Sequence, residues 1–225
     1  MWAAAEGLPT REEWDAALLE RIGPALWERF QRATVAVCGL GGLGSHIAVS
    51  LARAGVGRLH LIDFDRVDLT NLNRQQYTVE QLGQYKASQI GWEKPLALAE
   101  NLKEINPYLG LECHTLRLTP ENIPSLLQKA DVICEAFDKA EEKAMLVNTV
   151  LEQLPQATVV AASGMAGLGT GNSIRTWKVG KRLYLCGDGK SDVEDAGSLF
   201  APRVMLCAAH QALAVLRVLA GEPDV

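Results

Sequence analysis

The chain has 225 residues, of which 48% are hydrophobic and 22% charged, and this balance excludes a mainly disordered protein. Its formal net charge of −5 makes a generally basic nucleic-acid binder unattractive. Two long uncharged stretches, 33–52 and 153–174, are interrupted by glycines and polar side chains, and the N-terminus does not look like a signal peptide. We therefore expect no membrane association and a cytoplasmic protein.

Hydrophobic patterning predicts an alternation of strands and helices along the chain. The expected helices are 12–31 (broken at Gly23-Pro24), 45–54, 86–104, 120–129, 139–154 and 201–220. The expected strands are 34–38, 59–62, 111–115, 132–137, 158–162, and a late hairpin of 173–178 with 182–185. This order predicts an α/β fold with a Rossmann-like, doubly wound, mostly parallel sheet and a C-terminal antiparallel hairpin extension. We expect one domain, 1–225, with an N-terminal helical arm (1–33) and a core (34–220).

A glycine-rich turn lies between the first predicted strand and the helix that follows it. The glycines are Gly39, Gly41, Gly42 and Gly44. Such a turn lets the backbone approach a phosphate, and the helix N-terminus offers unpaired N–H groups to an anion. Asp63 ends the next predicted strand, where a carboxylate can bind ribose hydroxyls. Together these features predict nucleotide binding; a tight packing turn without a ligand is the alternative.

The residues after Asp63 favour ATP over NAD. Arg74 and Lys86 place two cations downstream of the glycine turn, which suits the β- and γ-phosphates of ATP. Either residue alone would more simply be a solvated surface charge. An NAD-dependent dehydrogenase remains the main alternative in another enzyme class, and a binding module without turnover is a third.

Several motifs together resemble the adenylation domain of the ThiF/MoeB/HesA family, which ubiquitin-activating enzymes share. The matching segments are 39–44, Asp63-Phe64-Asp65, Asn71-Leu72-Asn73-Arg74-Gln75, Lys86, 105–107, 135–138, 161–164 and Ala201-Pro202. The resemblance covers about residues 34–220. The segment 162–167 and the short length most resemble compact ThiF-like proteins linked to thiamine biosynthesis.

The resemblance implies ATP-dependent adenylation of the C-terminal glycine of a ubiquitin-like sulfur carrier protein ending in Gly-Gly, with release of pyrophosphate. It assigns ribose binding to Asp63, with Asp65 in the same motif. It assigns phosphate binding to Asn71, Arg74 and Lys86, with Gln75 in the same loop. Asp138 would bind Mg²⁺, and Arg74, Lys86 and Asp138 would be the catalytic residues. A helix N-cap is the alternative role for Asp138.

The chain departs from the family pattern at its cysteines. The five cysteines form no pair separated by two residues, so we expect no structural zinc. No cysteine precedes Ala201-Pro202 closely, which leaves Cys186 as the sole candidate for covalent chemistry and a non-catalytic thiol as its simpler interpretation.

The family pattern also implies a homodimer in which an N-terminal arginine reaches the partner's ATP. Arg21 is the first choice for this residue, and Arg11 is the second. The apolar side chains of Trp14, Trp27 and Phe30 would suit a dimer interface. A non-protein carboxylate, such as that of a modified tRNA base, is an alternative substrate, although the net charge makes nucleic acid unattractive.

Overall fold

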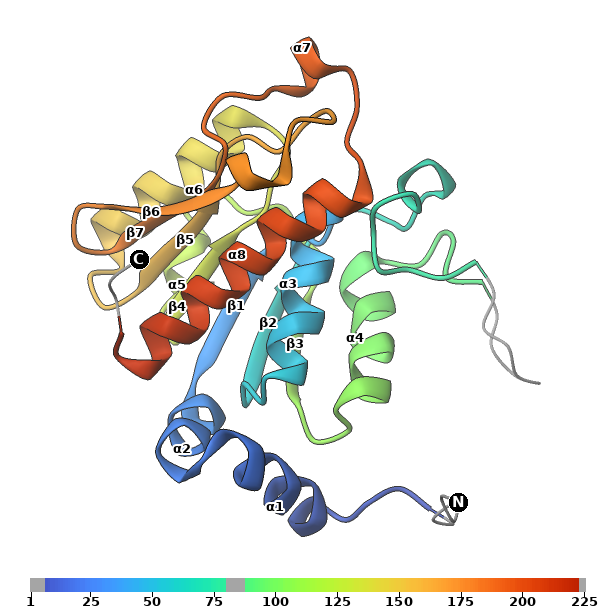
Figure 1. The fold of residues 1–225 in the computed structure, drawn as a ribbon, viewed down its shortest axis with the longest axis vertical. Coiled ribbons are helices and arrows are strands. Elements are labelled where there is room, and N and C mark those ends of the chain that lie inside the picture. Colours follow the sequence, from blue (N-terminus) through green and yellow to red (C-terminus); the bar gives the residue numbers. More distant parts are fainter. Residues whose placement is uncertain (1–6, 80–87, 223–225) are drawn as a thin grey trace.

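The computed structural model describes residues 7–79 and 88–222. Its strands form one seven-stranded sheet in the order β3-β2-β1-β4-β5-β7-β6. Every neighbouring pair is parallel except β7 and β6, which form the antiparallel hairpin (Figure 1). The strands are β1 (Thr34–Cys38), β2 (Arg58–Ile62), β3 (Gly110–His114), β4 (Val132–Glu135), β5 (Thr158–Ala162), β6 (Arg175–Val179) and β7 (Leu183–Gly187). The predicted α/β class, with its C-terminal antiparallel extension, is confirmed.

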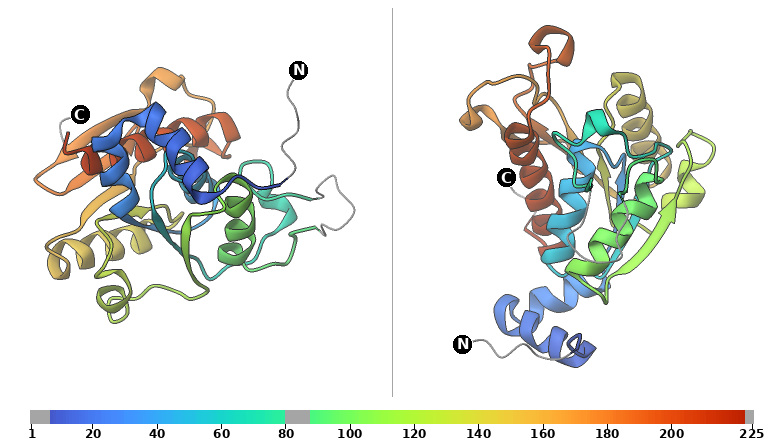
Figure 2. Two further views of the ribbon diagram at one scale, coloured as in Figure 1. Left: turned by 90° about the horizontal axis from the view of Figure 1, so that it is seen from below. Right: turned by 90° about the vertical axis from the view of Figure 1, so that its right-hand side faces the viewer.

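Helices cover both faces of the sheet. They are α1 (Arg11–Ile22), α2 (Pro24–Arg32), α3 (Gly42–Arg53), α4 (Lys94–Ile105), α5 (Ile123–Leu127), α6 (Ala140–Gln153), α7 (Val193–Ala196) and α8 (Ala201–Ala220). One apolar cluster joins α3, α4 and α8 to one face, and a second joins α5 and α6 to the other. The period-2 alternation of a strand explains this division, since Val35 and Val37 face the first cluster and Ala36 the second. Figure 2 shows the sheet between the two layers.

Three elements have the bounds that the sequence predicts: the strands 34–38 and 158–162 and the helix 201–220. The helix predicted at 86–104 differs, because α4 begins at Lys94. Val67 instead forms two backbone hydrogen bonds with the segment before α4: its N–H donates to the Trp92 carbonyl oxygen, and its carbonyl oxygen accepts from Gly91 N–H, each at 2.8 Å. Pro95 lies in the first turn of α4, where a missing N–H costs nothing, and this position fixes the helix start.

By length and composition, α8 is the one helix among the described residues that could cross a membrane. Its buried side chains, which include Val204, Cys207, Ala208 and Val215, pack in the cluster that covers the sheet. Figure 1 shows α8 running beside α3 across that face. The helix is therefore a core helix.

The helix predicted at 12–31 is interrupted as expected, with Gly23 between α1 and α2. The aromatic face proposed for a dimer packs partly on its own chain. Phe30 is buried, and a Cβ on Gly55 would lie 2.6 Å from the ring of Trp27. These two side chains therefore hold α2 against the turn between α3 and β2, which leaves less of that face for a partner.

Candidate active site

The loops at the carboxyl ends of the parallel strands enclose a cavity of about 890 Å³. Its wall comes from the loops after β1, β2, β4 and β5, together with the segments 71–75 and 191–194. The sheet order changes direction between β1 and β4, and such a switch point is where open α/β sheets bind ligands. The predicted residues that line this cavity are Gly39, Gly41, Gly42, Asp63, Asp65, Asn71, Arg74, Gln75 and Asp138.

The glycine turn divides into packing positions and a position that faces the cavity. Gly39 has φ +89°, and a Cβ there would lie 2.7 Å from the Ala136 carbonyl oxygen. A Cβ on Gly44 would lie 1.8 Å from the Gly39 carbonyl oxygen. At Gly41, by contrast, a Cβ would meet only the Gln75 side chain, at 3.8 Å. Gly39 and Gly44 thus permit the turn itself, whereas Gly41 leaves open space beside the cavity.

Helix α3 starts at Gly42, three residues earlier than predicted, so the glycine turn forms its first turn. Its N-cap is Gly41, and no side chain caps it. The first N–H groups of a helix lack intrahelical partners, and they favour an anion. The N-terminus of α3 at the cavity therefore suits a phosphate.

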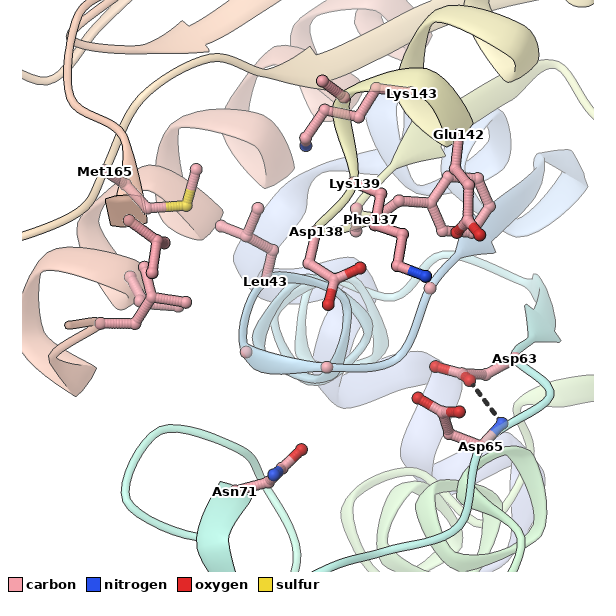
Figure 3. Close-up of a pocket in the computed structure, with 18 of the residues that line it drawn as sticks. Leu43, Asp63, Asp65, Asn71, Phe137, Asp138, Lys139, Glu142, Lys143 and Met165 are labelled. Carbon is pink, nitrogen blue, oxygen red and sulfur yellow. Dashed lines mark hydrogen bonds between the residues drawn. The ribbon is translucent and has the colours of Figure 1, made fainter. Parts of the chain in front are cut away.

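Asp63 follows β2 and is held by backbone donors. Leu40 N–H donates to one carboxylate oxygen (2.6 Å), and Asp65 N–H donates to the other (2.8 Å, dashed in Figure 3). These bonds tie the carboxylate to the glycine turn and fix its orientation. Each oxygen can accept a further hydrogen bond, so the group can still receive hydroxyl donors from the cavity.

Lys94 is a cavity residue that the sequence analysis did not single out. Its side chain is buried, with Nζ 3.0 Å from Asp65 Oδ2 and 3.9 Å from Asp63 Oδ2. Lys86, which the sequence predicts for the phosphate contact, lies outside the described residues, and its role stays a prediction. The Lys94-Pro95 pair could identify this lysine from the sequence. Proline favours the first turn of a helix, and helices of such a fold begin near the carboxyl ends of the strands, where ligands bind.

The segment after β2 brings three predicted polar residues to the cavity. Gln75 Nε2 donates to Asn71 Oδ1 at 2.8 Å, and Arg74 Nη1 donates to Asn73 Oδ1 at 2.9 Å. Gln75 Oε1 is buried and has no hydrogen-bond partner within residues 7–79 and 88–222. A buried acceptor of this kind is costly unless a ligand or water satisfies it.

Asp138 lies across the glycine turn from Asp63, with its carboxylate pointing into the cavity (Figure 3). The alternative role as an N-cap is wrong. Lys139 occupies the N-cap position of α6, and no side chain caps that helix. Among the residues described, none forms a hydrogen bond or ion pair with the Asp138 carboxylate. A carboxylate available in the cavity is the donor type that Mg²⁺ prefers, so the site fits this ion.

The cysteines lie outside the described wall of this cavity. Cys186 is buried, and burial raises its pKa to about 11, so the thiol is protonated near neutral pH. Cysteine is absent from the described wall of the cavity. Cys38 and Cys134 are buried in the sheet.

Arg21 does not line the cavity, because α1 lies at the opposite end of the sheet, where β1 begins (Figure 1). An interaction with ATP would therefore require a second subunit, and that role stays a prediction. Arg11, the second choice, pairs with Asp15 in the same helix and lies over the ring of Tyr108, in the segment between α4 and β3.

Known proteins with similar sequences are adenylyltransferases. A sulfur carrier protein adenylyltransferase from Thermus thermophilus is 36% identical over 158 residues, which cover 68% of this chain and 55% of that protein. The adenylyltransferase and sulfurtransferase MOCS3 of Anopheles gambiae is 35% identical over 129 residues, covering 57% of this chain and 28% of that protein. The chain thus spans about half or less of the length of these relatives.

Solved structures share the fold at low identity. The E. coli tRNA N6-threonylcarbamoyladenosine dehydratase TcdA, in complex with AMP, has a TM-score of 0.81 at 20% identity, covering 96% of this chain and 99% of that one. E. coli MccB with ATP has a TM-score of 0.64 at 20% identity, covering 89% and 59%. The profile of the ThiF family matches residues 15–225. The chain therefore belongs to the ThiF family.

Proposed function

We propose that the chain is an ATP-dependent adenylyltransferase. It activates the C-terminal glycine carboxylate of a ubiquitin-like sulfur carrier protein, of the kind used in thiamine biosynthesis, as an acyl-adenylate. The observation that carries the proposal is that three groups converge on one cavity: an uncapped helix N-terminus, the oriented Asp63 carboxylate, and the Asp138 carboxylate, which has no partner among the described residues. These groups match the phosphates, ribose and metal ion of a bound Mg²⁺-ATP.

Within this proposal the nucleotide lies along the glycine turn. Asp63 accepts hydrogen bonds from the ribose hydroxyls, and the space beside Gly41 admits the phosphates. Asn71 and Arg74 belong to the loop beside the glycine turn, and in this proposal they contact the phosphates. We propose Lys94 for the phosphate contact that the sequence assigns to Lys86, because its ammonium group already lies in the cavity.

Asp138 would hold Mg²⁺, which supplies charge neutralisation on the phosphates when bound. The remaining work of the protein is positioning. A terminal carboxylate has a pKa of about 3.5, so it is already ionised at neutral pH and needs no general base. A carboxylate oxygen attacks the α-phosphorus while the bond to the β-phosphate oxygen breaks, and pyrophosphate leaves with that electron pair. Arg74 and Lys94 stabilise the charge on the departing pyrophosphate.

The curated relatives support a protein substrate. The name of the T. thermophilus relative describes a sulfur carrier protein as its substrate, and the alignment covers two thirds of this chain. The buried state of Cys186 supports direct release of the acyl-adenylate rather than transfer to that thiol. We place the reaction in the cytoplasm and in a homodimer, with Arg21 reaching the partner's nucleotide.

ATP–pyrophosphate exchange tests the proposal. The chain is incubated with Mg²⁺-ATP, labelled pyrophosphate and one of three additions: a sulfur carrier ending in Gly-Gly, the same carrier lacking its last glycine, or tRNA. We expect exchange with the intact carrier alone. Exchange with tRNA but not with the carrier would indicate that the substrate is a nucleic-acid carboxylate. Exchange with none of the three additions would contradict adenylation. Binding of NAD without binding of ATP would identify the dehydrogenase alternative.

A further inference from the structure

A group of metal-ligating side chains lies outside the cavity, near the edge of the sheet. His60 is on β2, and Glu112 and His114 are on the edge strand β3, next to it in Figure 1. His60 and Glu112 are direct partners in the parallel register, and His114 follows Glu112 by two residues. Side chains two residues apart on a strand share a face, so the register brings all three to one face of the sheet.

The geometry of this group is that of a small metal site. His60 Nε2 lies 3.1 Å from Glu112 Oε2, and His114 Nε2 lies 3.0 Å from Glu112 Oε1. One ligand atom from each residue lies within 4.8 Å of the others. Tetrahedral ligands at bond lengths of about 2.0–2.1 Å stand about 3.3 Å apart, so small side-chain rotations complete the arrangement.

Contacts within the protein leave the two imidazoles incompletely satisfied. His114 Nε2 is close to the carboxylate but lacks hydrogen-bond geometry, and it is buried without a partner among residues 7–79 and 88–222. His60 Nδ1 is also buried without a partner there. Burial lowers the pKa of His60, which favours the neutral imidazole that a metal requires.

We propose that His60, Glu112 and His114 form a binding site for a divalent first-row transition-metal ion such as Zn²⁺. Two imidazoles and one carboxylate are a common ligand set for this class of ion, and water would complete the coordination. Glu112 is half exposed, which gives an ion a route from solvent. The positive charges of Arg58 and Lys129 also act on His60. We therefore expect moderate affinity rather than the very tight binding of a structural zinc site.

The site is separate from the cavity but joined to it through the backbone. None of the three side chains lines the described cavity wall. The N–H of Asp63 donates to the carbonyl oxygen of His114 at 3.2 Å, which links the end of β3 to the carboxylate proposed for ribose binding. A bound ion would hold β3 to β2 at this point and so steady the segment that carries Asp63.

Calorimetric titration of the tag-free, chelator-treated protein with Zn²⁺, without nucleotide, tests the site. We expect one bound ion per chain. Glu112→Gln, which keeps the size of an exposed side chain, and His114→Ala should each weaken binding by about tenfold or more. His210→Ala and Cys113→Ser are matched controls, since both residues lie outside the group and Cys113 contacts Pro95 on the other face. Both controls should bind as the wild type does.

Thermal unfolding gives a second measurement that does not depend on activity. An ion that binds the folded chain raises its melting temperature, so Zn²⁺ should raise that of the wild type and of His210→Ala, but not that of Glu112→Gln. Absence of saturable Zn²⁺ binding in the wild type would overturn the proposal. Unchanged binding in both Glu112→Gln and His114→Ala, or loss of binding in Cys113→Ser, would overturn it equally.

Discussion

Two carboxylates that follow one another at the end of β4 have opposite surroundings. Glu135 is fully buried and accepts hydrogen bonds from Phe137 N–H (2.7 Å), Ala162 N–H (3.3 Å) and Lys143 Nζ (3.1 Å). Asp138, three residues later, points into the cavity and bonds to none of the other described residues (Figure 3). The same chemical group thus holds the loop together at one position and remains available to a ligand at the next.

A second carboxylate that is bonded within the protein follows β7. Asp188 accepts hydrogen bonds from the N–H groups of Lys190 and Ser191, and it pairs with the buried Arg203. Arg203 in turn donates to the carbonyl oxygens of Gly169 and Thr170. Asp188 and the two Nη groups of Arg203 are bonded within the protein, whereas Arg203 Nε has no partner among the described residues. These bonds position the loops around the cavity. Internal hydrogen bonds therefore distinguish two structural carboxylates, Glu135 and Asp188, from Asp138, which charge alone does not.

The largest expected effect is that of Asp138→Ala. Loss of the metal-binding carboxylate should lower carrier-dependent pyrophosphate exchange by about 10²–10³-fold, because a strong transition-state contact disappears. The melting temperature should hardly change, since no hydrogen bond within the described protein is lost. Glu135→Ala should give the reverse pattern, with severe destabilisation from the buried donors left unpaired. Intact exchange in a folded Asp138→Ala protein would place the metal elsewhere.

Lys94→Met comes next. We expect exchange to fall by about 10²-fold and the KM for ATP to rise, because the variant loses an ammonium group and leaves Asp63 and Asp65 without their cation. Lys103→Met, on the exposed face of the same helix, is the matched control and should retain activity. Steady-state kinetics on both variants measure this difference. Equal activity of the two variants would remove Lys94 from the site and leave Lys86 as the candidate.

Two substitutions in the glycine turn separate an effect on the stability of the fold from an effect on ATP binding. Gly44→Ala should cost about 1–3 kcal/mol or more of unfolding free energy, because its Cβ would lie 1.8 Å from a backbone oxygen. Gly41→Ala should cost only about 1 kcal/mol, the usual penalty of alanine at an N-cap, since nothing lies within 3.8 Å of its Cβ, yet it should weaken ATP binding. Urea unfolding and ATP calorimetry on both variants separate the two effects. Unchanged ATP affinity in Gly41→Ala would place the phosphates elsewhere.

The hydrogen bonds and the ion pair of Asp188 predict that the stability of the fold depends on pH in the acidic range. Burial would raise the pKa of Asp188, but the hydrogen bonds that it accepts from Ser191, Lys190 and Arg203 outweigh burial and lower it to about 2. Because the folded pKa lies below the value of about 3.9 in unfolded chains, the carboxylate stabilises the fold at higher pH. This stabilisation is lost as the pH falls from about 4 towards 2. Urea unfolding across this range should show the advantage of wild type over Asp188→Asn disappearing; an advantage independent of pH would contradict the ion pair.

The smallest expected effect is that of Cys186→Ala. Exchange should stay within a few-fold of wild type, because the thiol is buried and protonated and the substrate carboxylate attacks phosphorus directly. The same carrier-dependent exchange assay measures it. A collapse of exchange in a folded Cys186→Ala protein would show that the cysteine takes part in the reaction.

The sequence predicts the sheet well because its signals are local. Short β-branched runs such as 34–38 and 158–162, and the apolar stripe of 201–220, determine their elements with correct bounds. The start of α4 is wrong in the sequence analysis because it depends on a backbone pairing between Val67 and Trp92, which lie far apart in the chain. Which residue caps a helix also depends on the folded backbone rather than on local sequence. For that reason the sequence leaves the N-cap alternative for Asp138 open.

The candidate site likewise has parts that local sequence signals predict and parts that only the fold brings together. Strand ends and the glycine turn place Gly41, Asp63 and Asp138 on one cavity, because carboxyl ends of parallel strands meet at one edge. The sequence does not single out Lys94, because its neighbours Asp63 and Asp65 lie about thirty residues away in the chain and only folding brings the three together. Similarly, the pairing of His60 with Glu112 depends on strand register, which periodicity alone does not specify.

Calorimetry of nucleotide binding tests the central claim most directly. The wild-type chain is titrated with ATP in the presence of Mg²⁺ and, separately, with NAD. The account predicts tighter binding of Mg²⁺-ATP, and predicts that Asp138→Ala removes the dependence on Mg²⁺, because in this account the Asp138 carboxylate holds that ion. Tighter binding of NAD than of ATP, or ATP binding with the same Mg²⁺ dependence in Asp138→Ala, would contradict it.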